Sequence, residues 1–439
     1  MTRLILEFHC QVIVLESLAK AITGWWLGFS DNITSRAPFS SVNKGKPILT
    51  SPDLTTLSEK LIAFRRDLHR HPELGWNEVR TCEKICNQLD SLGLKYRTTP
   101  GSTGVIADIE GPADVKAVAL RADIDALPVH EETGLEYSST KEGVMHACGH
   151  DGHTSMLLGA AELLASEKTL PAPVRLIFQP AEEIGDGALC MIENGCLDNV
   201  GVIFGGHLDR HFDAGKLIVT DGVVNASADT FYITVDGKGG HAARPHETVD
   251  AVVVGSLMIM ALQTIVSREV NPAHPSVVTV GKFEAGTASN VIAGRCKMEG
   301  TIRAQDDNVR QHLKTSLRRM AASVGQLHGA NVIVEIEDGL PVLENHKNVT
   351  ELARKAASEV VGENNVDEMP VANMGGEDFA YYLDKVPGCY IRFGAQVEGQ
   401  EYPAHSSRFV FDESALLMGA QYYRQVAIRA GESLRSGGI

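Results

Sequence analysis

The spacing of apolar residues changes at three points along the chain, and each change separates regions of different predicted structure. From residue 54 onward, segments with apolar residues at helical spacing alternate with short, continuously apolar runs that are typical of buried strands. The predicted helices are 56–68, 77–92 and 153–165, and the predicted strands are 104–109, 117–124 and 174–179. Alternation of this kind indicates an α/β sheet that helices cover on both faces.

The pattern changes near Ala228, where a different order of elements begins. Strands are predicted at 230–236, 276–282, 296–303 and 331–337, and helices at about 248–267 and at 307–327. This order is βαββαβ, a split βαβ sandwich. The chain then returns to its first pattern, with helices at 349–361 and 413–430 and a strand at 389–394. We therefore predict a main domain of residues 51–227 plus 342–439, with a second domain of residues 228–341 inserted into it.

Residues 1–50 fit neither pattern. An apolar stretch near residues 4–15 is interrupted by Glu7 and His9, and no convincing small-residue cleavage site follows it. The stretch is also too short and too charged to span a bilayer. We predict an N-terminal extension, whose structure the pattern leaves open, on a cytoplasmic protein that has no membrane partner.

Composition restricts the class of partner. The formal net charge of −16 argues against nucleic acid, because binding to phosphates depends on clustered Lys and Arg. A small molecule is the expected partner. The 8 cysteines are scattered along 439 residues, which favours free thiols in a reducing compartment over a disulfide framework.

One short segment, His146-Ala-Cys-Gly-His-Asp-Gly-His153, concentrates side chains that bind metals directly before a predicted helix. Thiolate and imidazole hold zinc and its neighbours in the divalent series. Three further segments add candidate ligands. Two of these segments lie where strands are predicted to end, and the third lies in the last part of the main domain, within residues 342–439. The candidate ligands are Cys148, His150, Glu183, His207 and His405.

The number of these side chains fits one metal ion with an open position, or two ions that share a bridging ligand. Cys148 is the expected bridge, because it lies between the other ligands of its segment. Neighbouring side chains point in different directions, so that Glu183 can bind metal while Glu182 faces the substrate. A carboxylate beside an activated water can accept its proton and pass it to a leaving nitrogen. We therefore predict hydrolysis, with Glu182 as the general base.

Seven motifs now carry a resemblance to a known family. They are Arg121-Ala-Asp-Ile-Asp-Ala-Leu-Pro, the segment 146–153, Gln179-Pro-Ala-Glu-Glu, Gly239-Gly-His-Ala-Ala-Arg-Pro-His, Ala288-Ser-Asn-Val-Ile, Gly300-Thr-Ile-Arg and Met374-Gly-Gly-Glu-Asp-Phe. In this order, over roughly residues 55–430, the chain resembles the aminoacylase and hippurate hydrolase branch of the metallopeptidase 20 clan, which includes the plant indole-acetyl-amino-acid hydrolases. The motifs are much more specific for the family than for the substrate.

The resemblance implies an α/β, mixed-sheet catalytic domain of the metallo-aminopeptidase type with an inserted ferredoxin-like (βαββαβ) domain that acts as lid and dimerises. It implies one or two Mn, Zn, Co or Ni ions per subunit, the same five ligands and base, and cleavage of an amide between an acyl group and an amino acid. A homodimer or higher homo-oligomer is expected. One departure is the segment after His207, which lacks the family's usual proline and places Arg210 and His211 close by.

The inserted region supplies further candidates for substrate contacts. His241 resembles the family histidine that stabilises the oxyanion, often in the neighbouring subunit. Asn290, Arg303 and Arg244 are candidates for binding a substrate carboxylate, since arginine can donate two parallel hydrogen bonds to it. The segment 375–378 is expected to orient metal-binding histidines, with Asp123 and Asp151 as alternatives for that task.

Three functions remain open on this basis. The first is hydrolysis of an N-acyl amino acid or of an aromatic acyl conjugate. The second uses the same activated water to release ammonia from an electron-poor aromatic amine. The third, disfavoured because Glu182 and every ligand position are present, is a metal-binding protein without catalytic activity.

Overall fold

The computed structural model describes residues 53–439, so the predicted N-terminal extension, 1–50, lies outside the described residues. An eight-stranded sheet has the order β1-β2-β4-β3-β5-β16-β6-β15. Its strands are β1 (Lys95–Thr98), β2 (Val105–Ile109), β3 (Ala117–Asp123), β4 (Val174–Gln179), β5 (Val200–Asp213), β6 (Leu217–Ile218), β15 (Val366–Asp367) and β16 (Gly388–Gln396). The strands β4, β3, β5 and β16 pair in parallel, whereas β1 and β2 join antiparallel. The predicted α/β mixed sheet is confirmed.

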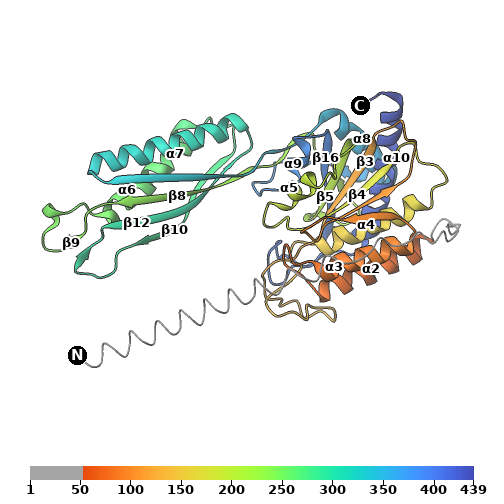
Figure 1. Cartoon of the computed structure of the whole chain (residues 1–439), viewed down its shortest axis with the longest axis horizontal. Helices are drawn as coiled ribbons and strands as arrows, with labels where there is room; N and C mark the ends of the chain where they lie inside the picture. The colour runs from red at the N-terminus through yellow and green to blue at the C-terminus, as the bar shows by residue number, and fades with distance from the viewer. Residues whose placement is uncertain (1–52) are drawn as a thin grey trace. The chain divides into compact units, whose positions relative to one another are not determined.

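Helices cover both faces of this sheet, as the alternation of elements predicts (Figure 1). One face packs on α2 (Leu54–Arg70), α3 (Val79–Ser91), α4 (His150–Ala165), α8 (Lys347–Val361) and α10 (Ser414–Ser436). The other face packs on the short helices α5 (Gly187–Glu193) and α9 (Ala380–Leu383). In β3, Leu120 belongs to the first core and Ala119 to the second. A strand that is buried on both faces is apolar throughout, which explains why β3 shows no alternation.

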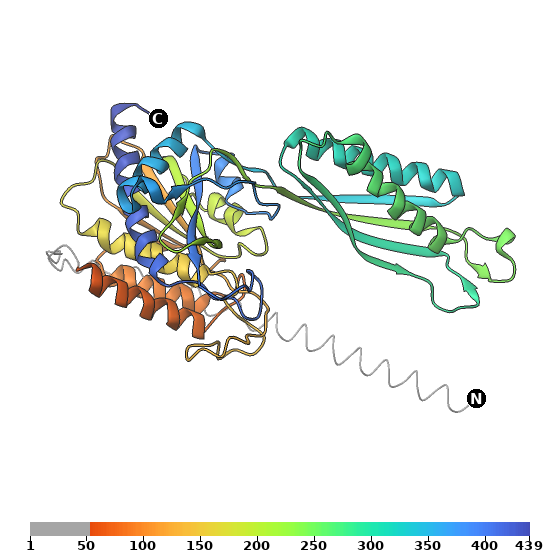
Figure 2. The ribbon, with the colours of Figure 1, turned by 180° about the vertical axis from the view of Figure 1, so that it is seen from behind.

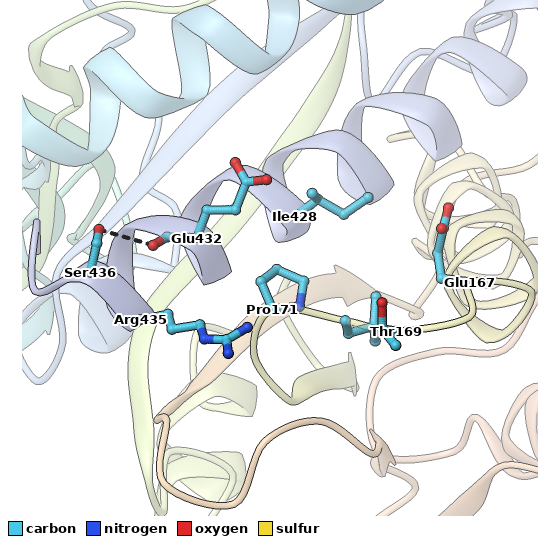
Figure 3. Close-up of a pocket in the computed structure, with 8 residues that line it drawn as sticks. Glu167, Thr169, Pro171, Ile428, Glu432, Arg435 and Ser436 are labelled. Carbon is cyan, nitrogen blue, oxygen red and sulfur yellow. Dashed lines mark hydrogen bonds between the residues drawn. The ribbon is translucent and has the colours of Figure 1, made fainter.

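The helix α4, which carries the metal-binding motif, is held closely by its neighbours. It begins at His150, three residues earlier than predicted, because Gly149 adopts the left-handed conformation that precedes it. A Cβ atom on Gly159 would lie 2.7 Å from the Cβ of Ala420 on α10, so this contact requires glycine. At the far end of α10, a pocket of about 470 Å³ opens towards the segment after α4 (Figure 3). None of the predicted site residues lines it.

A second, antiparallel sheet has the order β10-β12-β8-β13 and its own hydrophobic core. Its strands are β8 (Ser227–Asp236), β10 (Ser276–Ala285), β12 (Arg295–Ala304) and β13 (Asn331–Leu340), and its helices are α6 (Ala251–Thr264) and α7 (Asp307–His328). Both helices cover one face of the sheet (Figure 2). The order β8-α6-β10-β12-α7-β13 is the order predicted from the sequence. The domain bounds 51–227 plus 342–439 and 228–341 stay predictions.

The helix α6 is unusually apolar for one that lies on the surface of a sheet. Together with the π-helical turn Ile265–Glu269 it forms the segment Ala251–Glu269, of mean hydropathy 1.7. Among the described residues, this is the one segment long and apolar enough to cross a membrane. Met258 and Leu262 lie in the core of the second sheet, whereas Leu257 and Met260 are exposed. One side of α6 therefore packs in the core of the second sheet, as in a core helix.

A buried network of charges ties α2 to the start of α4. The Nε atom of Arg65 lies 2.8 Å from Oδ2 of Asp151, and both side chains are buried. His69 contacts the same oxygen through Nδ1 at 2.9 Å and Glu131 through Nε2 at 3.3 Å. Although burial acts to raise the pKa of Glu131, hydrogen bonds from His69, Thr133 and Ser139 lower it to about 2.

This network predicts an acid-sensitive contribution to stability. A carboxyl whose pKa is lower in the folded than in the unfolded state stabilises the fold above its unfolded pKa, and this contribution is lost as the pH falls towards the folded pKa. We expect Glu131→Gln to lower the free energy of unfolding by roughly 2–3 kcal/mol at pH 7, and by much less near pH 3. Denaturant unfolding of the metal-free protein measures both values. Glu59→Gln, exposed on α2, serves as the control, and an equal loss at both pH values would contradict the prediction.

Candidate metal centre

The predicted ligands come from loops at the carboxyl ends of the parallel strands, where sites form in sheets of this type. The strand β4 ends at Gln179 and is followed by Glu182 and Glu183, whereas His207 lies within β5. Cys148 and His150 lie at the start of α4. His405 adopts a φ of +68°, which is uncommon outside glycine, and its N–H donates to the carbonyl of Ala147 over 2.8 Å. That hydrogen bond fixes the loop of His405 against the motif 146–153.

The structure brings all five predicted ligands and Glu182 together. Three groups of ligating atoms each lie within 4.8 Å of one another, and they are Cys148/His150/His207, Cys148/Glu183/His405 and His150/Glu182/Glu183. The Sγ atom of Cys148 lies 3.3 Å from Nε2 of His207. Oε1 of Glu183 lies 3.4 Å from Nε2 of His405 and 3.8 Å from Nε2 of His150. Cys148 therefore belongs to two of the groups.

Buried atoms without partners show that these residues fit a metal ion. Nε2 of His150 and Oε1 of Glu183 are buried and have no hydrogen-bond partner. Such atoms cost free energy unless a bound group satisfies them, and an imidazole nitrogen beside a carboxylate oxygen and a thiol is a donor set that suits a divalent metal ion. Burial and the charge of Glu183 raise the pKa of the Cys148 thiol to about 12, so that a thiolate here requires a cation beside it. Burial, His153 and Arg392 keep the pKa of His207 well below its usual range, which leaves a neutral imidazole.

Carboxylates behind the cluster orient the histidines. Nδ1 of His150 lies 3.1 Å from Oδ1 of Asp125, whose Oδ2 accepts the N–H of Glu183 over 3.1 Å. Asp123, one of the expected candidates, instead lies 2.6 Å from Nδ1 of His153. Asp151 pairs with Arg65 and His69, away from the ligating nitrogens. Asp125, the residue in direct contact with His150, follows β3 but was not assigned this role from the sequence.

Glu182 lies among other carboxylates. Its oxygen, one from Glu377 and one from Asp378 lie within 4.8 Å of one another. Burial and the charges of Glu377, Asp378 and Glu183 raise the pKa of Glu182 well above its usual range. Arg121 donates to Asp378 over 2.7 Å and lies 3.2 Å from Glu377, which offsets part of this repulsion. Glu182 is thus placed where a carboxyl holds a proton readily.

A cavity of about 660 Å³ opens beside the cluster. Cys148, Glu182, Glu183, His207 and His405 all line it. Three arginines line the same cavity, namely Arg210, Arg303 and Arg392. His211 is a further lining residue, so the segment that departs from the family pattern does form part of the wall. The volume is that of a site for a small molecule.

Three predicted substrate contacts do not line this cavity. His241, Arg244 and Asn290 lie together at the two-stranded sheet of β9 (Gly240–His241) and β11 (Val291–Ile292). The carbonyl of Asn290 accepts the N–H of Ala242, and Arg244 lies 3.8 Å from Glu247. His241 and Arg244 are exposed. Their roles stay predictions, and for His241 the prediction already includes a neighbouring subunit.

Arg392 is the cavity residue that the sequence interpretation missed. It is 5% exposed and lies on β16, opposite His207 in the pairing with β5. A signal was present, because Arg392 is the one charged residue in the apolar run Cys389–Gly394. A charge in a strand that is predicted to be buried requires a partner or a function.

Comparisons with known proteins agree with this geometry. Residues 119–429 match the model of peptidase family M20/M25/M40. The chain is 39% identical to an N-acetyl-L-cysteine deacetylase of Bacillus subtilis, over 93% of this chain and 98% of that one. It is 36% identical to an IAA-amino acid hydrolase (ILR1-like 5) of Arabidopsis thaliana, over 96% of each chain.

A solved structure supports the same assignment. The crystal structure of the YXEP protein of Bacillus subtilis, described as a dinuclear metal-binding peptidase of the M20 family, matches with a TM-score of 0.77. It is 36% identical and covers 86% of this chain and 99% of its own.

The contacts of Asp125 predict a loss of metal affinity on substitution. An asparagine can accept from only one of the two N–H groups that Asp125 now accepts, so either His150 or Glu183 loses its orientation. We expect Asp125→Asn to weaken binding of a divalent transition metal about 10- to 100-fold. Competition with a chromophoric chelator measures the affinity. Asp108→Asn, on the exposed end of a pair with Arg175, is the control, and unchanged affinity in Asp125→Asn would refute the role of Asp125.

Proposed function

Because the chain belongs to peptidase family M20/M25/M40, we propose that it hydrolyses the amide bond of an N-acyl amino acid or of an aromatic acyl conjugate. The protein is a metal-dependent hydrolase that acts on C–N bonds. The observation that supports the finer proposal is the convergence of the five ligands beside Glu182. Cys148, Glu183, His207 and His405 line the same cavity as Glu182, and ligating atoms of His150 lie within 4.8 Å of theirs.

We assign metal binding to those five residues, with Cys148 as the bridge if two ions are bound. This assignment is supported by the position of Cys148, whose Sγ lies 3.3 Å from Nε2 of His207 and within 4.8 Å of ligating atoms of Glu183 and His405. Mixed sulfur, nitrogen and oxygen ligands suit Mn, Zn, Co or Ni. When bound, such an ion lowers the pKa of a water molecule towards 7 and polarises the carbonyl of the substrate.

Glu182 acts as the general base and then as the acid. It accepts one proton from the attacking water as the carbon–oxygen bond forms, and returns it to the nitrogen as the carbon–nitrogen bond breaks. The products are a carboxylic acid and a free amine. The position of Glu182, within 4.8 Å of ligating atoms of His150 and Glu183, supports this role.

Arg303 binds the carboxylate of the amino-acid half, since it lines the cavity from the inserted sheet. His241 stabilises the developing oxyanion from a second subunit, with Arg244 and Asn290 beside it. The exposure of His241 on its own subunit supports an action in a partner. A cytoplasmic location is part of the proposal and is supported by the free thiols of all described cysteines.

Glu182 tests the function directly. We expect Glu182→Gln to keep the metal content of the wild type and to lower turnover by about 100- to 10,000-fold, because the amide cannot accept the proton. Metal-loaded enzyme is given N-acyl amino acids, aromatic acyl glutamates and aromatic amino acids, and free amine and ammonia are measured separately. Release of the amino acid by the wild type but not by the variant supports the proposal. Ammonia from an aromatic amine with no amide cleaved would favour the alternative aminohydrolase, and unchanged turnover in the variant would refute the role of Glu182.

We also propose that the inserted domain forms a homodimer through an apolar surface of α6 and β10. This surface consists of Val252, Val253, Leu257 and Met260 of α6 and Phe283 of β10, which are all exposed. Phe283 lies against Gly255 of α6, so the helix and the edge strand form one continuous face. Contiguous exposed apolar surface marks an interface, and twofold dimers are the commonest assembly of identical chains.

A charge on this surface should prevent dimerisation. We expect the wild type to sediment as a dimer and Leu257→Glu to shift to the monomer at micromolar concentration, because a carboxylate would be buried without a partner. Leu327→Glu, on α7 at a position that is 78% exposed, is the matched control and should leave the dimer intact. Analytical ultracentrifugation of the metal-loaded protein measures all three. A monomeric wild type, or a dimeric Leu257→Glu, would contradict the proposal.

A further inference from the structure

The cavity beside the metal centre contains more positive charge than one substrate carboxylate requires. Arg210, Arg303 and Arg392 all line it. Among the described residues, none of the three has a carboxylate oxygen within 4 Å. Several acids of the same cavity are already paired, namely Asp209 with His211, Glu377 with Arg121 and Asp338 with Lys314.

Arg392 differs from every other buried arginine that the structure describes. Four arginines are buried, and three of them, Arg65, Arg121 and Arg310, contact a carboxylate. Arg392 is 5% exposed, and its one hydrogen bond is the donation from Nη2 to Oδ1 of Asn225. A buried charge without a counter-charge is strongly unfavourable, unless a ligand supplies the opposite charge.

Arg210 shares part of this arrangement. It follows His207 on β5, the strand that pairs in parallel with the strand of Arg392. Its Nε atom is buried and has no hydrogen-bond partner. Two guanidinium groups from adjacent strands of the main sheet therefore line the cavity, and neither is paired with a carboxylate among the described residues.

These cations come from a different part of the protein than Arg303. Arg392 and Arg210 lie on β16 and β5 of the large sheet, next to His207, whereas Arg303 lies on β12 of the inserted sheet. The cavity thus offers two arginines from the large sheet and one from the inserted sheet, with four of the five predicted metal ligands on the same wall. A ligand that pairs with the arginines of both sheets has two negatively charged groups.

We propose that Arg392, together with Arg210, forms a second anion-binding subsite, and that the preferred substrate is an N-acyl amino acid whose acyl group also carries a carboxylate. This inference rests on the proposed amide hydrolysis. The amino-acid carboxylate binds to Arg303, and the carboxylate of the acyl group binds to Arg392 and Arg210. Arginine is suited to this task because its planar donors match the two oxygens of a carboxylate.

A pair of substrates that differ in one charge tests the subsite. The N-succinyl and N-butyryl derivatives of one amino acid have acyl chains of equal length, and only the first ends in a carboxylate. Metal-loaded wild-type enzyme should hydrolyse the succinyl derivative with a kcat/KM at least about tenfold higher, the effect of one charge-assisted hydrogen bond. Equal values for the two substrates would overturn the proposal.

Substitution of Arg392 distinguishes recognition from a structural role. We expect Arg392→Met to lower kcat/KM for the succinyl substrate by about 10- to 100-fold and to change the butyryl value less than about threefold. Arg392→Lys should restore part of the preference, and Arg210→Met should reduce it. Arg295→Met, an exposed arginine of β12, is the control. An equal loss on both substrates would mean that Arg392 only supports His207, which overturns the subsite.

Binding without turnover separates this inference from the proposed function. Calorimetric titration of metal-loaded enzyme with succinate and with butyrate should show tighter binding of succinate, and Arg392→Met should remove the difference. If no acyl amino acid is cleaved but succinate still depends on Arg392, the proposed function fails and the anion subsite stands. If the butyryl substrate is cleaved and succinate binding does not depend on Arg392, the subsite fails and the function stands.

Discussion

The large domain depends on one constraint, the gathering of several electron-pair donors beside one cavity, two of them buried without a hydrogen-bond partner. Nε2 of His150 and Oε1 of Glu183 have no hydrogen-bond partner, and the Cys148 thiol lies between two groups of possible ligands. A bound cation would satisfy these atoms and the thiol together. The surrounding structure resists collapse because Asp125 fixes both His150 and Glu183 from behind.

The architecture was predictable where each local pattern had one physical explanation. Continuous apolar runs predicted the strands β3 and β4, and the carboxyl ends of these strands predicted the position of the site. The inserted sheet was predicted from the order of its elements. Its first strand, β8, was recognisable because its residues alternate between buried and partly buried. The start of α4 was missed by three residues, because the left-handed Gly149 allows the helix to begin at a ligand.

The remainder depends on contacts between segments that are distant in sequence. The lateral order of the strands, the extension of β5 to Asp213 and the pairing of Arg392 with His207 arise from packing, and no local pattern encodes them. The carboxylates that the sequence suggested for orienting the histidines were those of the segment 375–378, Asp123 and Asp151, and Asp125, which makes the direct contact with His150, was not among them. To choose Asp125 one had to know the turn after β3, which places Asp125 against His150 and Glu183, whereas Asp123 contacts His153 and Arg121.

The contact between α4 and α10 has a consequence for biosynthesis. Gly159 of α4 leaves room for Ala420 of α10, so the helix that begins at His150 packs on a segment that is translated much later. The ligand set likewise includes a residue that is translated late, His405. The inserted sheet is contiguous in sequence and has its own core, so it can fold on the ribosome as soon as it emerges. The metal-binding half must wait for the last helix to be translated. Until then the side of α4 that packs on α10 has no cover from that helix.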